Sequence, residues 1–256
     1  MRLDHFLALA NIGTKNKTRA LIYDNKIEVN EVICATPSTE VDASRDSISY
    51  QGKQLSITPV YYALHKPQNC LTAREPLAFT VFDCLKSVDQ NGLFAVGRLD
   101  KDTEGLIFLT NDGNFSNQLM APDQHIPKTY YFLSLGVLSS DKIKLLEQGM
   151  EIGDGIITKP AQVRLIKSGL YTDLSSEIGI EKMKKIKKQP VNQPAFIGEI
   201  IISEGKKHQV KRMLRGVHCP IVYLKRIAIG DFQLPDIAAG EFISFDKSTI
   251  IVSTKY

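Results

Sequence analysis

Gly97-Arg98-Leu99-Asp100-Lys101-Asp102-Thr103-Glu104-Gly105-Leu106 gathers three acidic residues around one arginine, between apolar runs at 93–96 and 106–109. A polar loop between two strand-like runs is a good place for catalytic residues, because a rigid scaffold holds it at the surface. From spacing alone, Asp100, Asp102 and Glu104 are equal candidates for a catalytic carboxylate. The alternative that spacing leaves open is a charged turn in which the arginine only neutralises its neighbours.

The chain around this loop alternates strand-like and helical segments, separated by turn residues. Apolar, β-branched and aromatic runs predict strands at 60–64, 93–96, 105–110, 130–133 and 197–202. Helices are predicted at 113–120, 140–148 and 209–217. We therefore expect an α+β domain over residues 59–256, with a mixed and mainly antiparallel sheet.

Residues 1–58 have the pattern of a separate small unit, and Pro59 follows as the predicted boundary. Leu3, Phe6, Leu7 and Ala10 are spaced as one face of a helix. A second helix is expected to start near residue 14 or 16 and to precede a strand at 26–29. Seven basic and seven acidic residues cancel over this unit, yet three cations gather at the start of the second helix, namely Lys15, Lys17 and Arg19.

Composition narrows the class of protein. A hydrophobic fraction of 43% and a charged fraction of 23% exclude a disordered chain. No apolar run approaches the ~18 residues of a membrane span, and the first residues lack the pattern of a secretory signal. We expect a cytoplasmic protein without membrane contact. The four cysteines are far apart and have no zinc-type spacing, so they are expected to be reduced and no metal site is predicted.

The net charge of +4 is too small to identify a nucleic-acid-binding protein by itself, but the charge is unevenly distributed. Residues 204–226 hold one acid, Glu204, against seven cations, which are Lys206, Lys207, Lys211, Arg212, Arg215, Lys225 and Arg226. This stretch is the best candidate for binding phosphates. A polar stretch at 167–194, with five lysines at 182–188, predicts a surface insertion that is either a solvated loop or a further contact with RNA.

Four motifs in the expected order resemble the pseudouridine synthase superfamily. Gly-Arg-Leu-Asp-x-x-Thr-x-Gly-Leu, continuing to Gly113, is similar to its catalytic motif. The others are Tyr62 to Pro67, similar to a Leu-x-Lys-Pro strand, Pro127 to Tyr130, similar to a Lys-x-Tyr segment, and Glu204 to Met213, similar to the third motif. Residues 1–30 resemble an S4 domain, a small RNA-binding module with an α-L-like fold. Together these segments identify the RsuA-like rRNA pseudouridine synthases as the family that the chain resembles.

The resemblance implies a reaction and assigns roles to residues. The enzyme converts a uridine of rRNA to pseudouridine without a cofactor, and Asp100 is its essential carboxylate. It would add to the sugar, add to the base or remove a 2′ proton. Tyr130 is the aromatic ring that stacks on the target base, while Tyr131, on the opposite face of the strand, is expected in the core. Lys211 is the basic partner of Asp100, with Arg212 as the alternative.

The remaining implied roles concern RNA binding. Arg98 is expected to enter the position that the extruded base leaves. Its alternative is a structural ion pair with Asp102 or Glu104. Further RNA contacts are expected from the S4-like unit and the third motif, namely Lys15, Lys17, Arg19, Lys206, Lys207, His208, Gln209 and Arg212.

The lysine of the third motif favours the small-subunit (16S) rRNA as substrate. We also expect a monomeric enzyme. A large-subunit (23S) enzyme is the alternative within the family. From other classes we keep two alternatives. One is a non-catalytic RNA-binding ribosome-assembly factor with the same fold. The other is a hydrolase using Asp100 and Asp102, which is disfavoured on the expectation that their i, i+2 spacing directs the two side chains to opposite faces of an extended segment.

Overall fold

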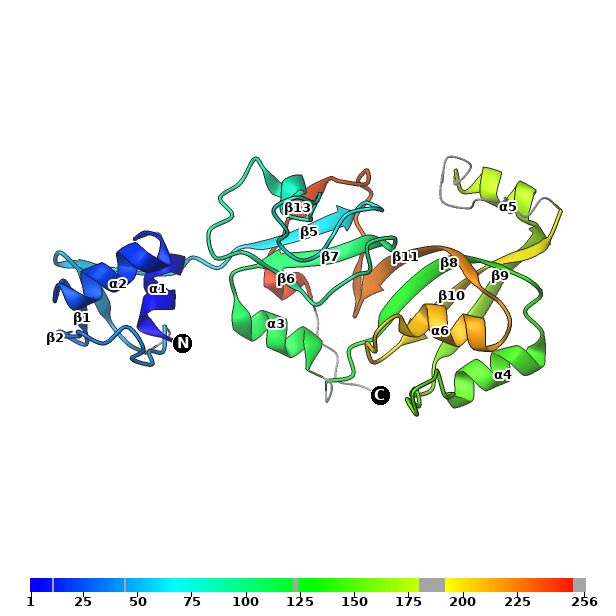
Figure 1. Ribbon diagram of the computed structural model, residues 1–256, viewed down its shortest axis with the longest axis horizontal. Helices are drawn as coiled ribbons and strands as arrows, with labels where there is room; N and C mark the ends of the chain where they lie inside the picture. The colour runs from blue at the N-terminus through cyan, green and yellow to red at the C-terminus, as the bar shows by residue number, and fades with distance from the viewer. Residues whose placement is uncertain (11, 44, 122–123, 180–191, 251–256) are drawn as a thin grey trace.

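A computed structural model describes residues 1–10, 12–43, 45–121, 124–179 and 192–250 of the chain. Figure 1 shows a small N-terminal unit joined by an extended segment to a larger body that contains one long curved sheet. The five lysines of the 182–188 segment lie outside the described residues.

The N-terminal unit has two helices, α1 (Leu3–Leu9) and α2 (Lys15–Tyr23), followed by a small sheet, as predicted. The sheet order is β2-β1-β3-β4, with β1 (Ile27–Val29), β2 (Val32–Ile33), β3 (Ile48–Tyr50) and β4 (Lys53–Gln54). The unit has a core of its own, to which both helices, the sheet and the segment between β2 and β3 contribute Leu3, Phe6, Leu7, Leu21, Ile22, Ile27, Val41 and Ile48. Burying these apolar side chains holds the two short helices in place, since helices of this length are unstable alone.

Within the described part of the chain, nine strands form the large sheet, in the order β13-β5-β7-β11-β8-β10-β9, with β6 paired to β7 and β12 to β11. Their bounds are β5 (Tyr61–Lys66), β6 (Phe94–Val96), β7 (Glu104–Thr110), β8 (Lys128–Leu135), β9 (Gln162–Leu170), β10 (Pro194–Ile202), β11 (Ile221–Ile229), β12 (Phe232–Gln233) and β13 (Phe242–Ser244). Of these pairings only β7 with β11 is parallel. The predicted mixed, mainly antiparallel sheet is therefore correct.

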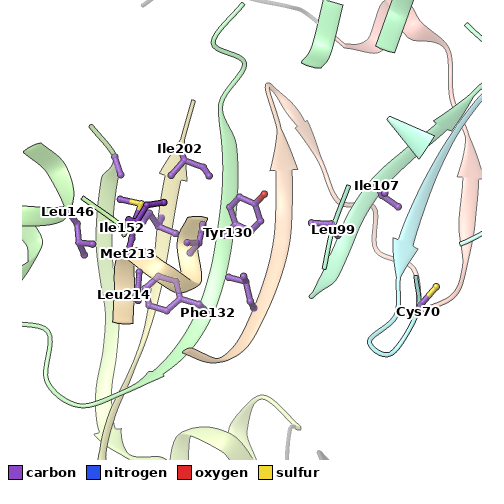
Figure 2. Close-up of a cluster of buried hydrophobic side chains, with 14 of the residues drawn as sticks. Cys70, Leu99, Ile107, Tyr130, Phe132, Leu146, Ile152, Ile202, Met213 and Leu214 are labelled. Carbon is purple, nitrogen blue, oxygen red and sulfur yellow. The ribbon is translucent and has the colours of Figure 1, made fainter. Parts of the chain in front are cut away.

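The helices are α3 (Gly113–Met120), α4 (Ser140–Gln148), α5 (Tyr171–Glu177) and α6 (Gln209–Gly216), with 3-10 turns η1 (Asp83–Leu85) and η3 (Lys247–Thr249). Helices α3, α4 and α6 lie where the sequence predicts them. Figure 2 shows side chains of α6, Met213 and Leu214, packed beside Tyr130 and Phe132 of β8. This core fixes α6, and with it the third motif, against the sheet.

The predicted insertion at 167–194 is only partly correct. Residues 167–170 continue strand β9, and the following residues form helix α5. Tyr171 and Leu174 are buried against Leu133, Ala195 and Ile197 of the sheet. The segment therefore begins as packed structure, because these two apolar residues anchor an otherwise polar stretch.

The two halves of the large sheet meet at the parallel pair β7 and β11, where only two register pairs form, Lys225 with Glu104 and Arg226 with Gly105. Gly105 has φ +109°, and a Cβ atom there would lie 2.2 Å from the Arg226 carbonyl oxygen. Only glycine allows the two backbones to approach this closely. The glycine of the catalytic motif therefore joins the two halves of the sheet.

Candidate active site

A hollow of about 80 Å³ lies where the loop before β7 meets the N-terminus of α6 and the strands β8, β10 and β11. Its lining residues are Arg98, Leu99, Asp100, Thr103, Tyr130, Ile202, Gly205, Lys206, His208, Gln209, Val210, Lys211 and Leu224. All three predicted catalytic residues, Asp100, Tyr130 and Lys211, are in this list. Segments more than one hundred residues apart in the sequence thus meet in one concave site.

The ammonium group of Lys211 holds two carboxylates. Its Nζ donates to Asp100 Oδ2 at 2.9 Å and to Asp102 Oδ1 at 2.6 Å. Residues 100–103 form a turn, closed by the Thr103 N–H donating to the Asp100 carbonyl oxygen at 3.1 Å. The expectation that Asp100 and Asp102 point to opposite faces is therefore wrong, because side chains two residues apart share one face of an extended segment, and here the turn brings both carboxylates to one ammonium group. Asp100 lines the hollow, whereas Asp102 is not among its lining residues.

A second basic group lies beside Asp100. The Nε2 atom of His208 is 3.4 Å from Asp100 Oδ1, on the carboxylate oxygen that Lys211 does not hold. His208 has φ 54° and stands immediately before α6. This left-handed backbone turns the chain into the helix and brings His208 and Lys211 to the same carboxylate.

The carboxylate loop is anchored by two residues that the sequence analysis did not assign to the site. Lys66, at the end of β5, is fully buried, and its Nζ donates to the carbonyl oxygens of Thr103 at 2.8 Å and Lys101 at 3.4 Å. Burial lowers the pKa of Lys66 to about 8. The Thr72 hydroxyl bonds both backbone groups of Leu99, donating to its carbonyl at 2.8 Å and accepting from its N–H at 3.2 Å. The Lys-Pro signal was the available clue to Lys66.

Glu104, the third acidic candidate, has a structural role. His65 Nε2 lies 2.8 Å from Glu104 Oε1, and Lys225 Nζ lies 3.6 Å from the same oxygen. Burial raises the pKa of Glu104, but the hydrogen bond from His65 and the charge of Lys225 outweigh it and lower the pKa overall. Glu104 thus links β5, β7 and β11 beside the site. It is not an ion-pair partner for Arg98, which lines the hollow instead.

The two neighbouring tyrosines lie on opposite faces of β8, as expected, but their burial is not as expected. Tyr130 lines the hollow and is 8% exposed, within the main hydrophobic core. Tyr131 is half-buried on the other face, with its ring 6.5 Å from that of Tyr223. The interpretation of Tyr131 as the core residue is therefore wrong, because the hollow itself is sunk into the main core. Tyr130 offers an aromatic surface at the floor of the site.

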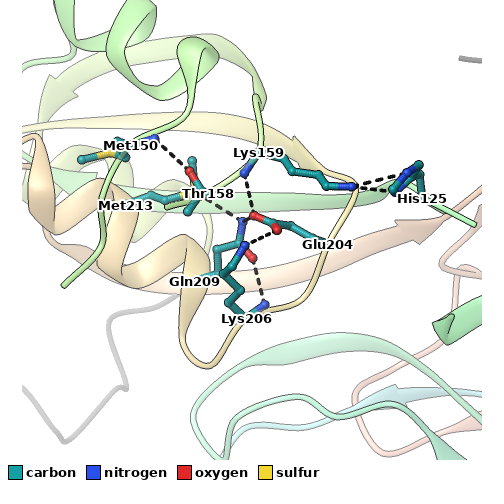
Figure 3. Close-up of polar contacts among 8 residues, drawn as sticks. All are labelled: His125, Met150, Thr158, Lys159, Glu204, Lys206, Gln209 and Met213. Atoms are coloured by element: carbon teal, nitrogen blue, oxygen red, sulfur yellow. Dashed lines mark hydrogen bonds and ion pairs between the residues drawn. The ribbon is translucent and has the colours of Figure 1, made fainter. Parts of the chain in front are cut away.

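The third motif is held by a polar network centred on Glu204 (Figure 3). Glu204 accepts from Gln209 Nε2 at 2.7 Å, from the Lys159 backbone N–H at 2.9 Å and from the Lys206 ammonium group. The Gln209 amide oxygen accepts from the Lys206 N–H at 2.9 Å. Gln209 is only 3% exposed and shapes the turn before α6, so it is a positioning residue. Gln209 also lines the hollow, so its contact with RNA stays a prediction.

Much of the cationic stretch at 204–226 is used within the protein. Arg212 donates to the Ile152 carbonyl at 2.6 Å and to Asp154 at 3.0 Å, so it is not the partner of Asp100. Arg226 is 2% exposed and donates to the Leu106 carbonyl at 2.8 Å. The stretch is therefore not the continuous phosphate-binding surface that its sequence indicated. Lys207 and Arg215 remain exposed, and Lys206 lines the hollow.

In the N-terminal unit, Lys15 and Lys17 are exposed at the first turn of α2. Arg19 is also part of an internal ion pair, because its Nε donates to the buried carboxylate of Asp4 at 2.9 Å. Arg2 holds the same carboxylate at 3.0 Å. Arg19 thus helps to hold α2 against α1, and its contact with RNA stays a prediction.

Among the described residues, no group of three or more histidine, cysteine or acidic side chains could hold a metal ion. Of the described residues that line the hollow, Asp100 is the acidic one. Lys211 and His208 can both donate a hydrogen bond to the Asp100 carboxylate between them, which fixes its position in the hollow. A planar ligand can stack on Tyr130 beside it. The arrangement suits an attack on, or proton transfer from, one nucleoside.

The fold and the site together define an enzyme class. The family model of RNA pseudouridylate synthases matches residues 60–215, which include Asp100, Tyr130 and Lys211. The chain therefore belongs to the RNA pseudouridylate synthase family and is a pseudouridine synthase.

Similar proteins agree with this assignment. The ribosomal small subunit pseudouridine synthase A of Yersinia pestis is 30% identical, over 94% of this chain and 93% of its own. A putative chloroplastic ribosomal large subunit pseudouridine synthase of Arabidopsis thaliana, SVR1, is 31% identical over 97% of this chain, which spans 59% of that protein. A crystal structure of a pseudouridylate synthase has a TM-score of 0.60 and 26% identity, covering 97% of both chains.

The helices of the described residues are all too short or too polar to cross a membrane.

Proposed function

We propose that this enzyme isomerises one uridine of ribosomal RNA to pseudouridine and that Asp100 is its catalytic carboxylate. The observation that carries the proposal is the position of Asp100, which lines the hollow with Lys211 at 2.9 Å and Tyr130 in the same lining. No other acidic residue lines this hollow within the described part of the chain.

The reaction breaks the N1–C1′ bond of the uridine, turns the base and joins C5 to C1′. N1 gains a proton and C5 loses one, so the nucleotide keeps its atoms and the step needs no oxidant, reductant or cofactor. Asp100 acts at the sugar or base as the bond breaks. Lys211 and His208 hold its carboxylate in place, and Tyr130 provides a flat surface on which the freed uracil turns.

RNA binding uses cations around the hollow. Arg98, Lys206 and His208 line it, and Lys207 is exposed next to them. Arg98 replaces the extruded base in the stack, because its planar guanidinium suits stacking on bases. Residues 1–58 are an S4-like module separate from the catalytic domain at 59–256, and its exposed Lys15 and Lys17 bind phosphates. One chain supplies every one of these groups, so the enzyme acts as a monomer.

We propose small-subunit rRNA as the substrate. The sequence of the third motif, with Lys211 after His208-Gln209-Val210, supports this choice. The similar proteins carry both small-subunit and large-subunit names. The large-subunit rRNA is therefore the second candidate, and one experiment separates the two.

The test is chemical mapping of pseudouridine in both rRNAs from cells that lack the gene. We expect one site to be missing from 16S rRNA and to return with the wild-type gene but not with Asp100→Asn. Asp102→Asn is the matched control, because Asp102 shares Lys211 but does not line the hollow. It should restore the site.

Other results would change the assignment in specific ways. A missing site in 23S rRNA would show that the substrate is the large-subunit rRNA and not the small-subunit rRNA. Full restoration by Asp100→Asn would refute the catalytic carboxylate. No missing site in either rRNA, together with a defect in ribosome assembly, would favour a binding factor of the same fold.

A further inference from the structure

A second hollow lies across Arg98 from the candidate active site. It measures about 290 Å³, near the lower end of the range for small-molecule sites. Its lining residues are Thr72, Ala73, Arg74, Phe82, Leu93, Phe94, Ala95, Gly97 and Arg98. Arg98 is shared by both hollows, so a ligand in the second one would lie next to a nucleotide in the first.

Arg74 is held flat at one wall of this hollow. Its guanidinium carbon is 3.7 Å from the centre of the Phe82 ring, so one face of the guanidinium covers that ring. Its Nη2 donates to the carbonyl oxygens of Gln90 at 3.2 Å and Leu93 at 3.3 Å, which fix its plane. The side chain is nevertheless exposed. A fixed guanidinium with a free face is a surface on which a nucleobase stacks.

The other lining residues also suit a stacked nucleobase. Phe94 is half-buried and adds an aromatic ring, while Ala73 and Gly97 are small and leave the hollow open. The charged residues in the lining are Arg74 and Arg98, and no acid accompanies them within the described residues. Two cations, aromatic rings and no acid suit a planar ligand that carries a negative charge.

The loop that carries Arg74 is built into the sheet. The Leu71 N–H donates to the Phe79 carbonyl, and the Val81 N–H donates to the Leu71 carbonyl, both at 2.9 Å, which closes the loop at its base. Thr72 bonds Leu99 as described above, one residue before Asp100. The second hollow is thus fixed relative to the catalytic carboxylate before any RNA binds.

We propose that this second hollow binds an unstacked nucleobase that neighbours the target uridine in the RNA. The base stacks between Arg74 and Phe94, and its phosphate lies towards Arg98. The site would hold the strand open on one side of the extruded uridine and would contribute to the choice of sequence. The proposal rests on the proposed function, because it takes an RNA strand as the substrate.

The chain has no tryptophan, so a single introduced indole reports on this hollow without background. The experiment titrates Phe94→Trp with an eight-nucleotide oligoadenylate and with an abasic ribose-phosphate oligomer of equal length. Binding is followed independently through the anisotropy of a fluorescein label on each oligomer. Leu145→Trp is the matched control, because Leu145 is 52% exposed on α4 and is not among the lining residues.

We expect oligoadenylate to quench the indole of Phe94→Trp by at least half and the abasic oligomer to leave it unchanged. Leu145→Trp should respond to neither. Adding Ala73→Glu should raise the oligoadenylate concentration at half-maximal quenching about tenfold, within the range for one base stacked on an aromatic ring. Ala73→Gln, of similar size and without charge, should raise this concentration less.

Two results would overturn the proposal. In the first, the anisotropy shows that oligoadenylate binds to Phe94→Trp, but the indole fluorescence is not quenched. In the second, oligoadenylate does not bind at all. The proposed function fails separately, when the wild-type enzyme isomerises no rRNA uridine. Quenching without isomerisation would support the base-binding hollow and refute the proposed reaction. Isomerisation without quenching would support the proposed reaction and refute the base-binding hollow.

Discussion

Lys66 donates a 2.8 Å hydrogen bond to the carbonyl oxygen of Thr103, which ties the end of strand β5 to the loop that carries Asp100. The lysine is fully buried and lies behind the loop, outside the lining of the hollow. In the proposed reaction, Lys66 is a positioning residue that acts through the loop carrying the carboxylate.

We predict that Lys66→Met lowers kcat/KM by about ten- to a hundredfold, because the carbonyls of Lys101 and Thr103 lose their donor and the carboxylate moves. Stability should change by less than about 2 kcal/mol at neutral pH, since removing a buried cation offsets part of the loss. Steady-state kinetics and urea unfolding measure the two effects. Wild-type kinetics with unchanged stability would show that the loop does not depend on this lysine.

The same lysine predicts a dependence of stability on pH. Its pKa in the folded protein is about 8, below the value of ~10.4 in an unfolded chain, so between these values the unfolded state binds more protons. The free energy of unfolding of the wild type should therefore rise, relative to that of Lys66→Met, as pH increases from 8 to 10.4. The difference should reach about 3 kcal/mol, and urea unfolding at several pH values measures it. A difference that is constant over this range would contradict the lowered pKa.

We predict that Lys211→Met and Arg212→Met have different effects, although the residues are adjacent. Lys211→Met removes the cation from Asp100 and should reduce kcat by at least a hundredfold. Arg212→Met leaves the hollow intact and should mainly destabilise the protein, by about 1–3 kcal/mol, because the carbonyls of Ile152 and Gly153 lose their donor. Comparable losses of kcat in both variants would contradict the assignment of Lys211.

The close approach of β7 and β11 makes Gly105 essential for folding. Gly105→Ala should destabilise the protein by more than about 3 kcal/mol, because its Cβ atom would collide with the Arg226 backbone and its φ is +109°. Gly113→Ala is the control, since no atom lies within 4 Å of its added Cβ atom at the start of α3. It should be neutral or stabilising, by up to about 1 kcal/mol. Thermal unfolding of the two variants should separate them clearly.

The buried Asp4 should make the N-terminal unit sensitive to acid. The hydrogen bond from Arg2 holds its pKa well below the usual range, against the opposing effect of burial, and Arg19 adds to this. Its contribution to stability is therefore present above about pH 4 and is lost as pH falls further. Asp4→Asn should destabilise the unit by about 1–3 kcal/mol. Asp24→Asn, which only breaks the exposed pair with Lys26, should change stability by less than about 0.5 kcal/mol.

Much of the fold could be predicted because the signals are local. Helix α3 spans Gly113–Met120 as predicted, since Asp112 caps it by accepting from the N–H groups of Asn114 and Phe115. Strand β11 was not predicted, because Lys225 and Arg226 interrupt its apolar pattern. Arg226 is buried there, and its Nε donates to the carbonyl oxygen of Leu106, which is distant in sequence. Such a partner cannot be read from the strand itself.

The candidate site shows the same limit. Asp100 and Lys211 are 111 positions apart, and only the family resemblance connected them. The expectation for Asp102 was wrong because residues two apart share a face of an extended segment. The turn at 100–103, whose carbonyls Lys66 anchors, could not be predicted from the spacing either. The cations at 204–226 were interpreted as one surface, whereas Arg212 and Lys225 pair with acids of other segments and Lys206 pairs with Glu204 inside the stretch. Charge counted along a chain does not tell which charges face solvent.

The short parallel contact between β7 and β11 also has a consequence for the time at which the enzyme becomes active. Asp100 belongs to one half of the sheet and Lys211 to the other, and the halves join through two register pairs. Each half is held by antiparallel neighbours that are mostly closer in sequence, so each can form before this distant contact closes. Catalytic ability is then acquired in a late step of folding, and recovery of activity after refolding should lag behind recovery of secondary structure.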